Sequence, residues 1–252
     1  MPNSRQDAER NVLVRFWTLD HLERSSVEWS VTDWTKLVFA ATGTLRVESN
    51  SQLWILPSSR GLWVKPGEKN QMMCFGPANV RTLYFHPSFE PLRTRGTIEI
   101  SELLHSLIIE TCLVGPLMRG NAIHEAMATL LRSQIEQAKT MPSGITMPFE
   151  PGVRSAAERF LDSPNSWSDL NKLAESAGYS RRTLERRFVE ETGLSLGRWC
   201  REARMLEGIR CMSMGHSVSD AAFRAGYAST SSFIHTFKRH FGSTPGATSS
   251  AM

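Results

Sequence analysis

Two short stretches in the C-terminal half carry side chains that can bind the edges of DNA bases. Residues 177–193 read AGYSRRTLERRFVEETG and contain four arginines. Residues 225–242 read AGYASTSSFIHTFKRHFG and contain hydroxyl side chains, histidine, lysine and arginine. Arginine can donate two hydrogen bonds to guanine O6 and N7 in the major groove, and Ser, Thr, Lys and Arg also bind backbone phosphates. These residue types therefore suit double-stranded DNA.

The two stretches are copies of one pattern. Ala174, Gly178 and Tyr179 recur 48 residues later as Ala222, Gly226 and Tyr227, and Ser180, Leu184, Phe188 and Gly193 recur 49 residues later as Ser229, Phe233, Phe237 and Gly242. The Ala lets two helices approach closely, the Gly permits a tight turn, and the Ser caps the second helix. The two apolar residues four positions apart anchor that helix inward. Each copy predicts a helix-turn-helix, the first over about 168–192 and the second over about 217–241.

A continuous helix is predicted between the two copies. Apolar residues recur at helical spacing from 196 to 214, and Trp199 and Cys200 among them are expected in the core. A helix of this length spans about 28 Å. It can therefore hold two recognition helices about 34 Å apart, which is one turn of B-DNA.

The candidate DNA-binding residues share a position on the outward face of a predicted recognition helix, at its cap, or on the linker helix. They are Ser180, Arg181, Arg182, Thr183, Glu185, Arg186, Arg187, Arg201, Arg204, Ser229, Thr230, Ser231, Ser232, His235, Thr236, Lys238 and Arg239. Glu185 either accepts from cytosine N4 or orients Arg181 or Arg182. The alternative for the whole set is a solvated charged face with internal pairs, such as Glu185 with Arg181. Turn, cap and repeat together favour DNA contact.

Residues 153–248 resemble the DNA-binding domain of the AraC/XylS family of transcriptional regulators. The resemblance rests on LAESAGYSRRTLERRFVEETGLSLGRW, on Arg201, Arg204 and Met205 of the linker helix, and on VSDAAFRAGYASTSSFIHTFKRHFGSTPG. It implies that bases are contacted by Arg182, Glu185 and Arg186 in the first unit and by Thr230, Ser231, Ser232 and His235 in the second. It also implies RNA polymerase as a partner if the protein is an activator.

The N-terminal half predicts an antiparallel β sandwich or barrel. Short apolar runs broken by turn signals follow one another: TKLVFA, TLRVES, QLWILP, GLWVKPG, NQMMCFG and VRTLYFHP. Two helical stripes follow, one formed by Ile100, Leu103, Leu104, Leu107 and Ile108 and the other by Ile123, Met127, Leu130, Leu131 and Ile135. The second stripe is either a dimer helix or a helix packed on its own barrel.

More faintly, this half resembles the cupin-like sensor barrel of one branch of the same family. The carriers are WSVTDWTKLVFAATGTLRVE, LWILPSSRGLWVKPGEKNQM and RTLYFHP. That branch has histidines at three positions where this chain has Ser30, Thr32 and Asn70. These side chains are poor metal ligands. The chain is therefore expected to bind no metal or other cofactor and to lack cupin dioxygenase or isomerase chemistry.

Barrel mouths commonly bind small ligands. The candidate pocket residues are Trp29, Thr32, Trp34, Lys36, Trp63, Asn70 and Tyr84. Each tryptophan is more readily explained as barrel core than as a ligand contact. Lys36 interrupts an apolar run, so it either binds an anionic effector or faces solvent on an alternating strand.

The predicted fold class is α+β with several domains. They are a cupin-like β-barrel sensor domain at 1–98, a helical segment at 99–141 suited to dimerisation, a linker at 142–152, and an all-α DNA-binding domain at 153–248. Residues 1–150 hold 15 Lys and Arg against 15 Asp and Glu, whereas residues 151–252 hold 14 against 10, so the net charge of +4 lies in the C-terminal part. That asymmetry suits a polyanionic partner. No run of 18 apolar residues and no paired cysteine motif occurs in the sequence, so a cytoplasmic protein that does not enter a membrane is expected.

Three functions remain open at this point. The first is a one-component transcription factor, activator or repressor, with a barrel that senses a small molecule and twin helix-turn-helix units that bind a promoter. The second is a regulator whose barrel serves only dimerisation or partner binding. The third is a cupin-type enzyme, which the missing metal ligands disfavour.

Overall fold

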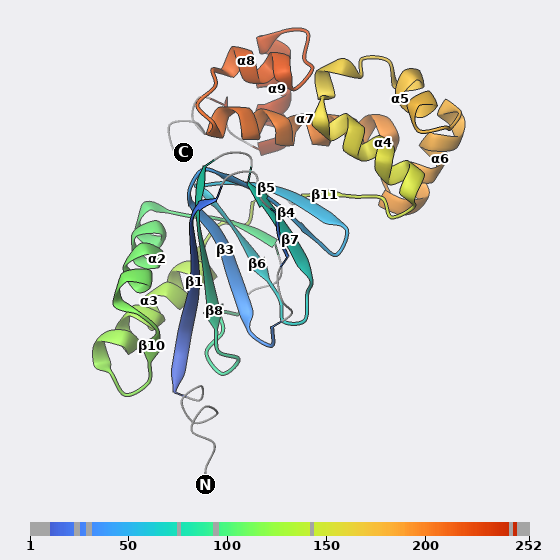
Figure 1. Ribbon diagram of the computed structural model, residues 1–252. Helices are drawn as coiled ribbons and strands as arrows, with labels where there is room; N and C mark the ends of the chain where they lie inside the picture. The colour runs from blue at the N-terminus through green and yellow to red at the C-terminus, as the bar shows by residue number, and fades with distance from the viewer. Residues whose placement is uncertain are drawn as a thin grey trace. The chain divides into compact units, whose positions relative to one another are not determined.

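The computed structural model describes residues 11–22, 26–28, 32–74, 77–92, 96–141, 144–241 and 244–245. The chain divides into two units (Figure 1). The β-rich unit consists of Met1–Leu45 and Leu56–Met141, and the helical unit consists of Arg46–Ile55 and Pro142–Met252. A short internal segment, residues 46–55, therefore belongs with the C-terminal part of the chain.

The strands occur where short apolar runs are separated by turn residues. They are β1 (Val12–Leu22), β2 (Ser26–Glu28), β3 (Thr35–Thr42), β4 (Thr44–Ser49), β5 (Gln52–Pro57), β6 (Arg60–Val64), β7 (Asn70–Cys74), β8 (Ala78–Phe85), β9 (Gly96–Glu99), β10 (Leu117–Met118) and β11 (Ile145–Thr146). Each of the six apolar runs named above contains a strand, so the prediction of a strand-rich region is confirmed. Between β4 and β5, Asn50 and Ser51 both have positive φ angles of 48° and 58°. Two such residues form the tight turn that suits the twist of a β-hairpin.

The β-rich unit contains a six-stranded antiparallel sheet in the order β10-β1-β8-β3-β6-β9, and β2 pairs separately with β7. Within the described residues this sheet is open, with β10 and β9 at its edges. The prediction of a strand-rich N-terminal region is confirmed. Among the described residues, this sheet does not close into a barrel. Its core includes residues of α2 (Glu102–Val114) and α3 (Ala122–Gln137), which pack on one face of the sheet through Leu104, Ile108, Leu131 and Ile135.

The helical unit contains α4 (Pro151–Asp162), the 3₁₀ turn η1 (Pro164–Ser166), α5 (Leu170–Ser176), α6 (Arg181–Thr192), α7 (Leu196–Ser213), α8 (Val218–Arg224) and α9 (Thr230–Phe241). The predicted helix-turn-helix units are α5 with α6 and α8 with α9. The predicted linker helix is α7, which has 18 residues and ends one residue earlier than expected. None of the helices that the structure describes has the length and hydropathy that crossing a bilayer requires.

The segment 46–55 and the residues before α4 form a small β structure in the helical unit. Ile145 of β11 pairs with Leu53 of β5, and Gln52 Nε2 donates to Thr146 Oγ1 at 2.6 Å. Trp199 Nε1 of α7 donates to Thr146 O at 2.7 Å. Residues 145–146 are thus a paired strand inside the stretch that the sequence suggests as a linker. The local sequence has no periodic pattern that indicates a strand. The strand forms here because the edge of β5 is available for pairing.

Candidate nucleic-acid interface

The first helix-turn-helix forms as its sequence predicts. Gly178 has a φ of +78°, a conformation that glycine adopts without strain, and it closes the turn after α5. Ser180 caps α6, because its Oγ accepts from Thr183 N at 3.2 Å. Leu184 and Phe188 are fully buried, and the Phe188 ring lies 5.3 Å from that of Trp199 on α7. The inward face therefore fixes which residues of α6 point to solvent.

The outward face of α6 carries both basic and acidic side chains. Arg181 Nε donates to Glu185 Oε1 at 2.6 Å, and Arg186 Nη1 donates to Glu190 Oε1 at 2.7 Å. Arg187 lies 3.7 Å from the other oxygen of Glu190. The Arg181–Glu185 pair is the one that the solvated-face alternative expects. Exposed pairs of this kind contribute only about 0.3–0.5 kcal/mol, so their arginines can be redirected to an anionic ligand at small cost.

The second helix-turn-helix repeats this construction. Gly226 has a φ of +79°, and Ser229 Oγ accepts from Ser232 N at 3.2 Å at the start of α9. Phe233 and Phe237 are fully buried, as their counterparts Leu184 and Phe188 are. The predicted caps, turns and anchors of both units are therefore confirmed.

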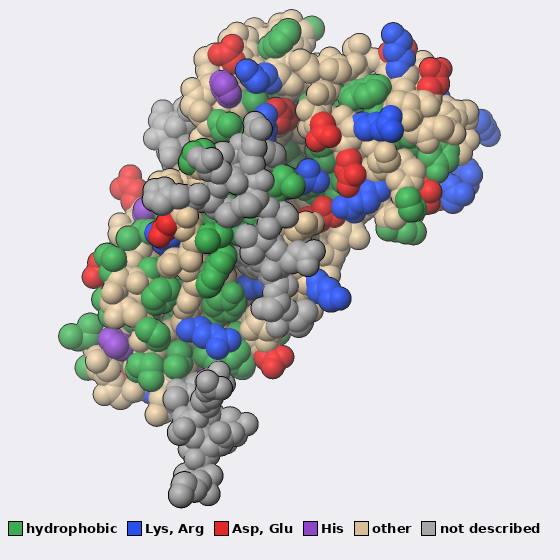
Figure 2. All heavy atoms as spheres, in the orientation of Figure 1, with side chains coloured by type: hydrophobic (Ala, Val, Ile, Leu, Met, Phe, Trp, Pro, Cys, Tyr) green, Lys and Arg blue, Asp and Glu red, His purple; other side chains and the backbone are tan. Residues whose placement is uncertain are grey.

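The outward face of α9 is polar, and its acidic side chains are fewer than those of α6. Ser231, Ser232, His235, Lys238 and Arg239 are exposed. Thr230 Oγ1 donates to Ser219 Oγ of α8 at 3.3 Å, and Thr236 Oγ1 donates to Ser232 O at 2.9 Å. Thr230 and Thr236 are thus partly occupied by contacts within the unit. On the side seen in Figure 2, basic and acidic side chains alternate over the helical unit.

Four exposed Lys and Arg side chains of α6, α7 and α9 have no ion pair within the described residues: Arg182 on α6, Arg201 on α7, and Lys238 and Arg239 on α9. They all belong to the candidate DNA-binding set. Unpaired cations retain their full attraction for a polyanion, so these four are the positions best suited to bind phosphate without breaking an existing contact.

Of the residues of the linker helix α7 that the sequence singles out, some are buried in the core and others lie at the surface. Trp199 and Cys200 are buried, as expected. Arg201 is exposed, but Arg204 is half-buried, with its guanidinium 5.5 Å from the centre of the Phe160 ring and Nη2 donating to Trp167 O at 3.4 Å. Arg204 is therefore held inside the unit, apart from the surface arginines. Burial also raises the pKa of the Cys200 thiol to about 12, so this thiol stays protonated at neutral pH.

Part of the candidate ligand set converges in the β-rich unit. Lys36 of β3 is 1% exposed, its Nζ donates to Asn70 Oδ1 at 3.4 Å, and it lies opposite Tyr84 in the sheet register. The solvent-facing alternative for Lys36 is therefore wrong. Burial lowers the pKa of Lys36 to about 8, against the opposing effect of Glu68.

Arg15 is a neighbour of this group that the sequence analysis missed. Its guanidinium lies 4.2 Å from the Trp34 ring centre and 5.5 Å from that of Tyr84. Thr32 Oγ1 accepts from Trp34 N at 3.1 Å. Arg15 interrupts the apolar run VLVRFW just as Lys36 interrupts its own run, so the same signal could have identified it.

Trp63 does not join the residues around Lys36. It pairs with Leu37 across β3 and β6, and adjacent residues of a strand point to opposite faces, so Trp63 and Lys36 lie on opposite sides of the sheet. Trp63 is fully buried in the cluster that includes α2 and α3, as the core explanation expects. Trp29 lies outside the described residues, as does Ser30. No group of three or more His, Cys, Asp or Glu side chains suited to a metal occurs among the residues that are described.

Comparison with known proteins identifies relatives of both parts of the chain. A family model described as a helix-turn-helix domain matches residues 173–251. NimR of Escherichia coli, an HTH-type transcriptional regulator, is 26% identical over 212 residues, which cover 84% of this chain and 78% of NimR. PqrA of Proteus vulgaris is 33% identical over 82 residues, which cover 32% of this chain and 67% of PqrA.

A solved structure also aligns with the C-terminal part. The DNA-binding domain of AdpA, crystallised with a target DNA, is 31% identical and aligns over 40% of this chain and 91% of that domain, with a TM-score of 0.38. The helix-turn-helix match covers the two units whose caps, turns and buried anchors are described above, and the relatives that align with it are transcriptional regulators. The chain belongs to the AraC/XylS family of DNA-binding transcriptional regulators.

Proposed function

We propose that this protein is a one-component regulator that binds a specific promoter sequence through two successive major grooves, with α6 in one groove and α9 in the next. The observation that carries the proposal is the duplicated unit. Each copy has the same turn glycine, capping serine and pair of buried anchors, and one helix of 18 residues joins them. Such a helix is about 27 Å long, which suits recognition helices about one turn of B-DNA apart.

The two units are proposed to divide base reading and backbone binding between them. On α6, the base contacts are assigned to Arg182, Glu185 and Arg186, with Ser180, Arg181, Thr183 and Arg187 beside the backbone. On α9, Thr230, Ser231, Ser232 and His235 face the bases, while Ser229, Thr236, Lys238 and Arg239 face phosphates. Because α6 offers arginines where α9 offers hydroxyls, α6 is expected to discriminate more strongly between base pairs.

Footprinting on the DNA upstream of the protein's own gene tests this function. The expected result is protection of two segments separated by one helical turn. Protection of a single segment, or of none, would contradict the two-groove proposal. Operator sequence and oligomeric state follow from the same experiment.

Arg186→Ala tests the assignment of base contacts. Loss of a bidentate contact costs about 1–3 kcal/mol at one base position and relaxes the preference there. The matched control is Arg224→Ala, which removes an exposed arginine of α8 outside both recognition helices. Binding constants for a set of singly substituted operators give the answer. If Arg186→Ala weakens all of them equally, Arg186 binds only phosphate.

The proposal assigns a sensing role to the β-rich unit. Lys36, Asn70, Tyr84 and Arg15 bring two cations and two hydrogen-bonding side chains to one region, which suits an anionic small molecule. Trp34 and Thr32 lie beside them. Thermal shifts with a panel of metabolites test this role, because a ligand that binds the native state raises its stability. A panel without effect favours the alternative role described next.

The alternative is a β-rich unit that serves dimerisation or partner binding. Leu103 and Leu113 of α2 and Ile123 and Leu130 of α3 are between 41% and 76% exposed, and Figure 2 shows hydrophobic side chains gathered in this region. Exposed apolar patches often mark protein interfaces. Sedimentation of the full chain, with Ile123→Glu as the disrupting variant, distinguishes a homodimer from a monomer.

We assign residues 1–98 to sensing, 99–141 to association, 142–152 to the connection and 153–248 to DNA binding. The chain is proposed to act without catalysing a reaction, in the cytoplasm where promoter DNA lies, and to contact RNA polymerase if it activates transcription. A stoichiometric metal in the purified protein would instead favour the cupin-type enzyme.

A further inference from the structure

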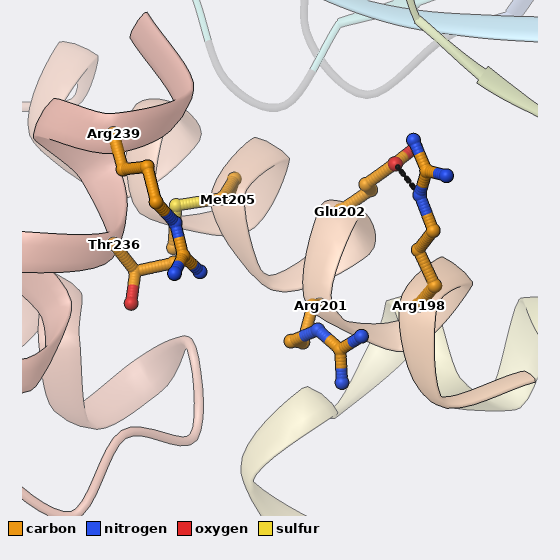
Figure 3. A pocket seen from close by; sticks show the side chains of 6 residues that line it. All are labelled: Arg198, Arg201, Glu202, Met205, Thr236 and Arg239. Carbon is orange, nitrogen blue, oxygen red and sulfur yellow. Dashed lines mark hydrogen bonds and ion pairs between the residues drawn. The ribbon is translucent and has the colours of Figure 1, made fainter. Parts of the chain in front are cut away.

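A cleft in the helical unit lies between α7 and the second half of α9, and three of its six lining residues are arginines. It has a volume of about 240 Å³. Four of the lining residues come from α7 and two from α9: Arg198, Arg201, Glu202, Met205, Thr236 and Arg239 (Figure 3). Arg204, the other arginine of this part of α7, does not line it.

The cleft exists because α9 covers only part of one face of α7. Positions 198, 201, 202 and 205 lie on one face at helical spacing. Further along α7, the neighbouring positions pack against α9, and a Cβ at Gly208 would meet the Phe233 ring at 2.6 Å. Towards the N-terminus of α7, the face lines the cleft together with Thr236 and Arg239 of α9.

The cleft has a net positive charge. Arg198 Nε donates to Glu202 Oε1 at 3.1 Å, as the dashed line in Figure 3 marks, so these two side chains neutralise each other. Arg201 and Arg239 have no ion pair or hydrogen bond among the residues that the structure describes. Thr236 donates to Ser232 O within α9, so its hydroxyl would have to rotate before it could donate to a phosphate. Two unpaired guanidinium groups from different helices remain.

The two unpaired arginines act on a common neighbour. The Tyr227 hydroxyl oxygen is buried, and its burial raises the pKa of Tyr227, while the Thr236 side chain and, to a smaller extent, Arg204, Arg201 and Arg239 oppose that rise. Arg201 of α7 and Arg239 of α9 thus line the same cleft from two helices. An anion in the cleft would be attracted by both guanidinium groups, since opposite charges stabilise each other.

We propose that this cleft binds one phosphate group of the DNA backbone between Arg201 of α7 and Arg239 of α9. The inference rests on the proposed function and adds a contact between the linker helix and the backbone. Arg239 lies one turn beyond His235 on α9, so a strand that borders the groove read by His235 is within reach. The volume of about 240 Å³ is smaller than the roughly 300–1,000 Å³ of typical small-ligand pockets, which favours a phosphate with its sugar over a whole effector.

The contact would have a mechanical effect on recognition. A phosphate held by arginines of two helices ties α9 to α7 only when DNA is present. This fixes the position of the second recognition helix along the duplex without reading sequence, which is the usual role of phosphate contacts.

The test compares the full-length wild type with the Arg201→Gln/Arg239→Gln double variant on the footprinted duplex, over a series of salt concentrations. Loss of one neutralised phosphate lowers the slope of log affinity against log salt by about 0.9. Ethylation of individual phosphates should reveal one position that blocks the wild type and no longer affects the double variant. Arg224→Gln, the matched exposed control on α8, should leave that position sensitive.

Glu202→Gln tests the cleft in the opposite direction. It removes the one carboxylate from the lining and frees Arg198. The expected result is tighter DNA binding and a steeper salt slope, which a merely destabilised protein would not show. An unchanged slope in the double variant would overturn the proposal, and so would the absence of any gain for Glu202→Gln.

Free phosphate esters are the other source of the same chemistry. Thermal shifts with inorganic phosphate and with AMP, at constant ionic strength, distinguish a free phosphate ester from a phosphate of the DNA backbone. Stabilisation of the wild type but not of the double variant, with an unchanged DNA salt slope, would overturn the backbone assignment in favour of a free ester. If the wild type binds no duplex, the proposed function and this proposal are both overturned. If the wild type binds the duplex and the double variant shows the same slope of log affinity against log salt, only this proposal is overturned.

Discussion

Gly208 of α7 lies against the Phe233 ring of α9, and its replacement by alanine tests the packing that orients the second recognition helix. A Cβ at this position would lie 2.6 and 2.7 Å from two atoms of the Phe233 ring. Phe233 is fully buried, and its ring is 5.6 Å from that of Phe237 and 5.4 Å from that of Tyr227. A shift of the ring away from α7 would therefore disturb its contacts with these two rings.

The expected magnitude combines two opposing effects. Overpacking a buried contact costs about 1–3 kcal/mol. Replacing glycine by alanine inside a helix returns up to about 1 kcal/mol. Gly197→Ala on the same helix is the matched control, because a Cβ there meets only the Arg201 Nη1 atom at 3.9 Å. Gly208→Ala should therefore be less stable than Gly197→Ala by about 1–3 kcal/mol.

Urea unfolding of the full-length variants, followed by far-ultraviolet circular dichroism, measures this difference, and equal m values would make the midpoints comparable. DNA affinity should fall with stability in Gly208→Ala, because a displaced Phe233 moves Ser232 and His235 on the same helix. If Gly208→Ala is as stable as Gly197→Ala, the Phe233 ring is not fixed against α7, and α9 has more freedom than described above.

Three further predictions concern the helix cap, the backbone contacts and the buried lysine. Ser180→Ala removes the cap of α6 and should lower the free energy of unfolding by about 1 kcal/mol in urea titrations, whereas Ser176→Ala, outside any cap, should have a smaller effect. Lys238→Ala should reduce the slope of log affinity against log salt by about one unit, and an unchanged slope would remove Lys238 from the backbone-binding set. The pKa of Lys36 is lowered to about 8 from 10.5, so between these pH values the unfolded chain binds more protons than the folded chain. The free energy of unfolding of the wild type minus that of Lys36→Met should therefore rise from pH 8 to pH 10, by at most about 1.4 kcal/mol per pH unit. A difference that does not change with pH would show that burial does not lower the pKa of Lys36.

The helix-turn-helix units could be predicted from the sequence because their determinants are local. Each unit needs a glycine for the turn, a serine four positions before an apolar anchor, and a second anchor one turn later. All of these residues lie within about 15 positions of the sequence. Their recurrence made the pattern specific. The positions of Gly178, Ser180 and Phe188 in the structure follow from those requirements.

The interior of the β-rich unit was less predictable because strand faces depend on distant partners. Lys36 and Leu37 are adjacent, yet the first lies beside Asn70 and the second faces Trp63 and the α2–α3 cluster. The sequence does not determine which face the later helices cover, so Trp63 was grouped with Lys36. Similarly, nothing in residues 145–146 indicates a strand until Leu53, far away in sequence, provides an edge.

The cleft residues Arg198 and Glu202 were also missed. They flank Arg201 on the same helix face, but their spacing alone reads as an ordinary ion pair. Only the incomplete coverage of α7 by α9 makes that face a cleft. That packing depends on the close contact of Gly208 with Phe233, which belong to the linker helix and to the second repeat.

The segment 46–55 changes how the two units are connected. Two domains joined by a simple linker share one chain crossing, but here the chain passes between the units three times, after Leu45, after Ile55 and after Met141. Glu48 of this segment forms an ion pair with Arg154 of α4, and Leu53 pairs with Ile145. A C-terminal fragment beginning near residue 142 would therefore lack an internal piece of its own fold. It would leave β11 without its partner strand, and Arg154 would keep Glu158 but lose Glu48. Cutting the whole protein once near residue 142 would therefore not release the complete helical unit, because residues 46–55 would stay with the other fragment.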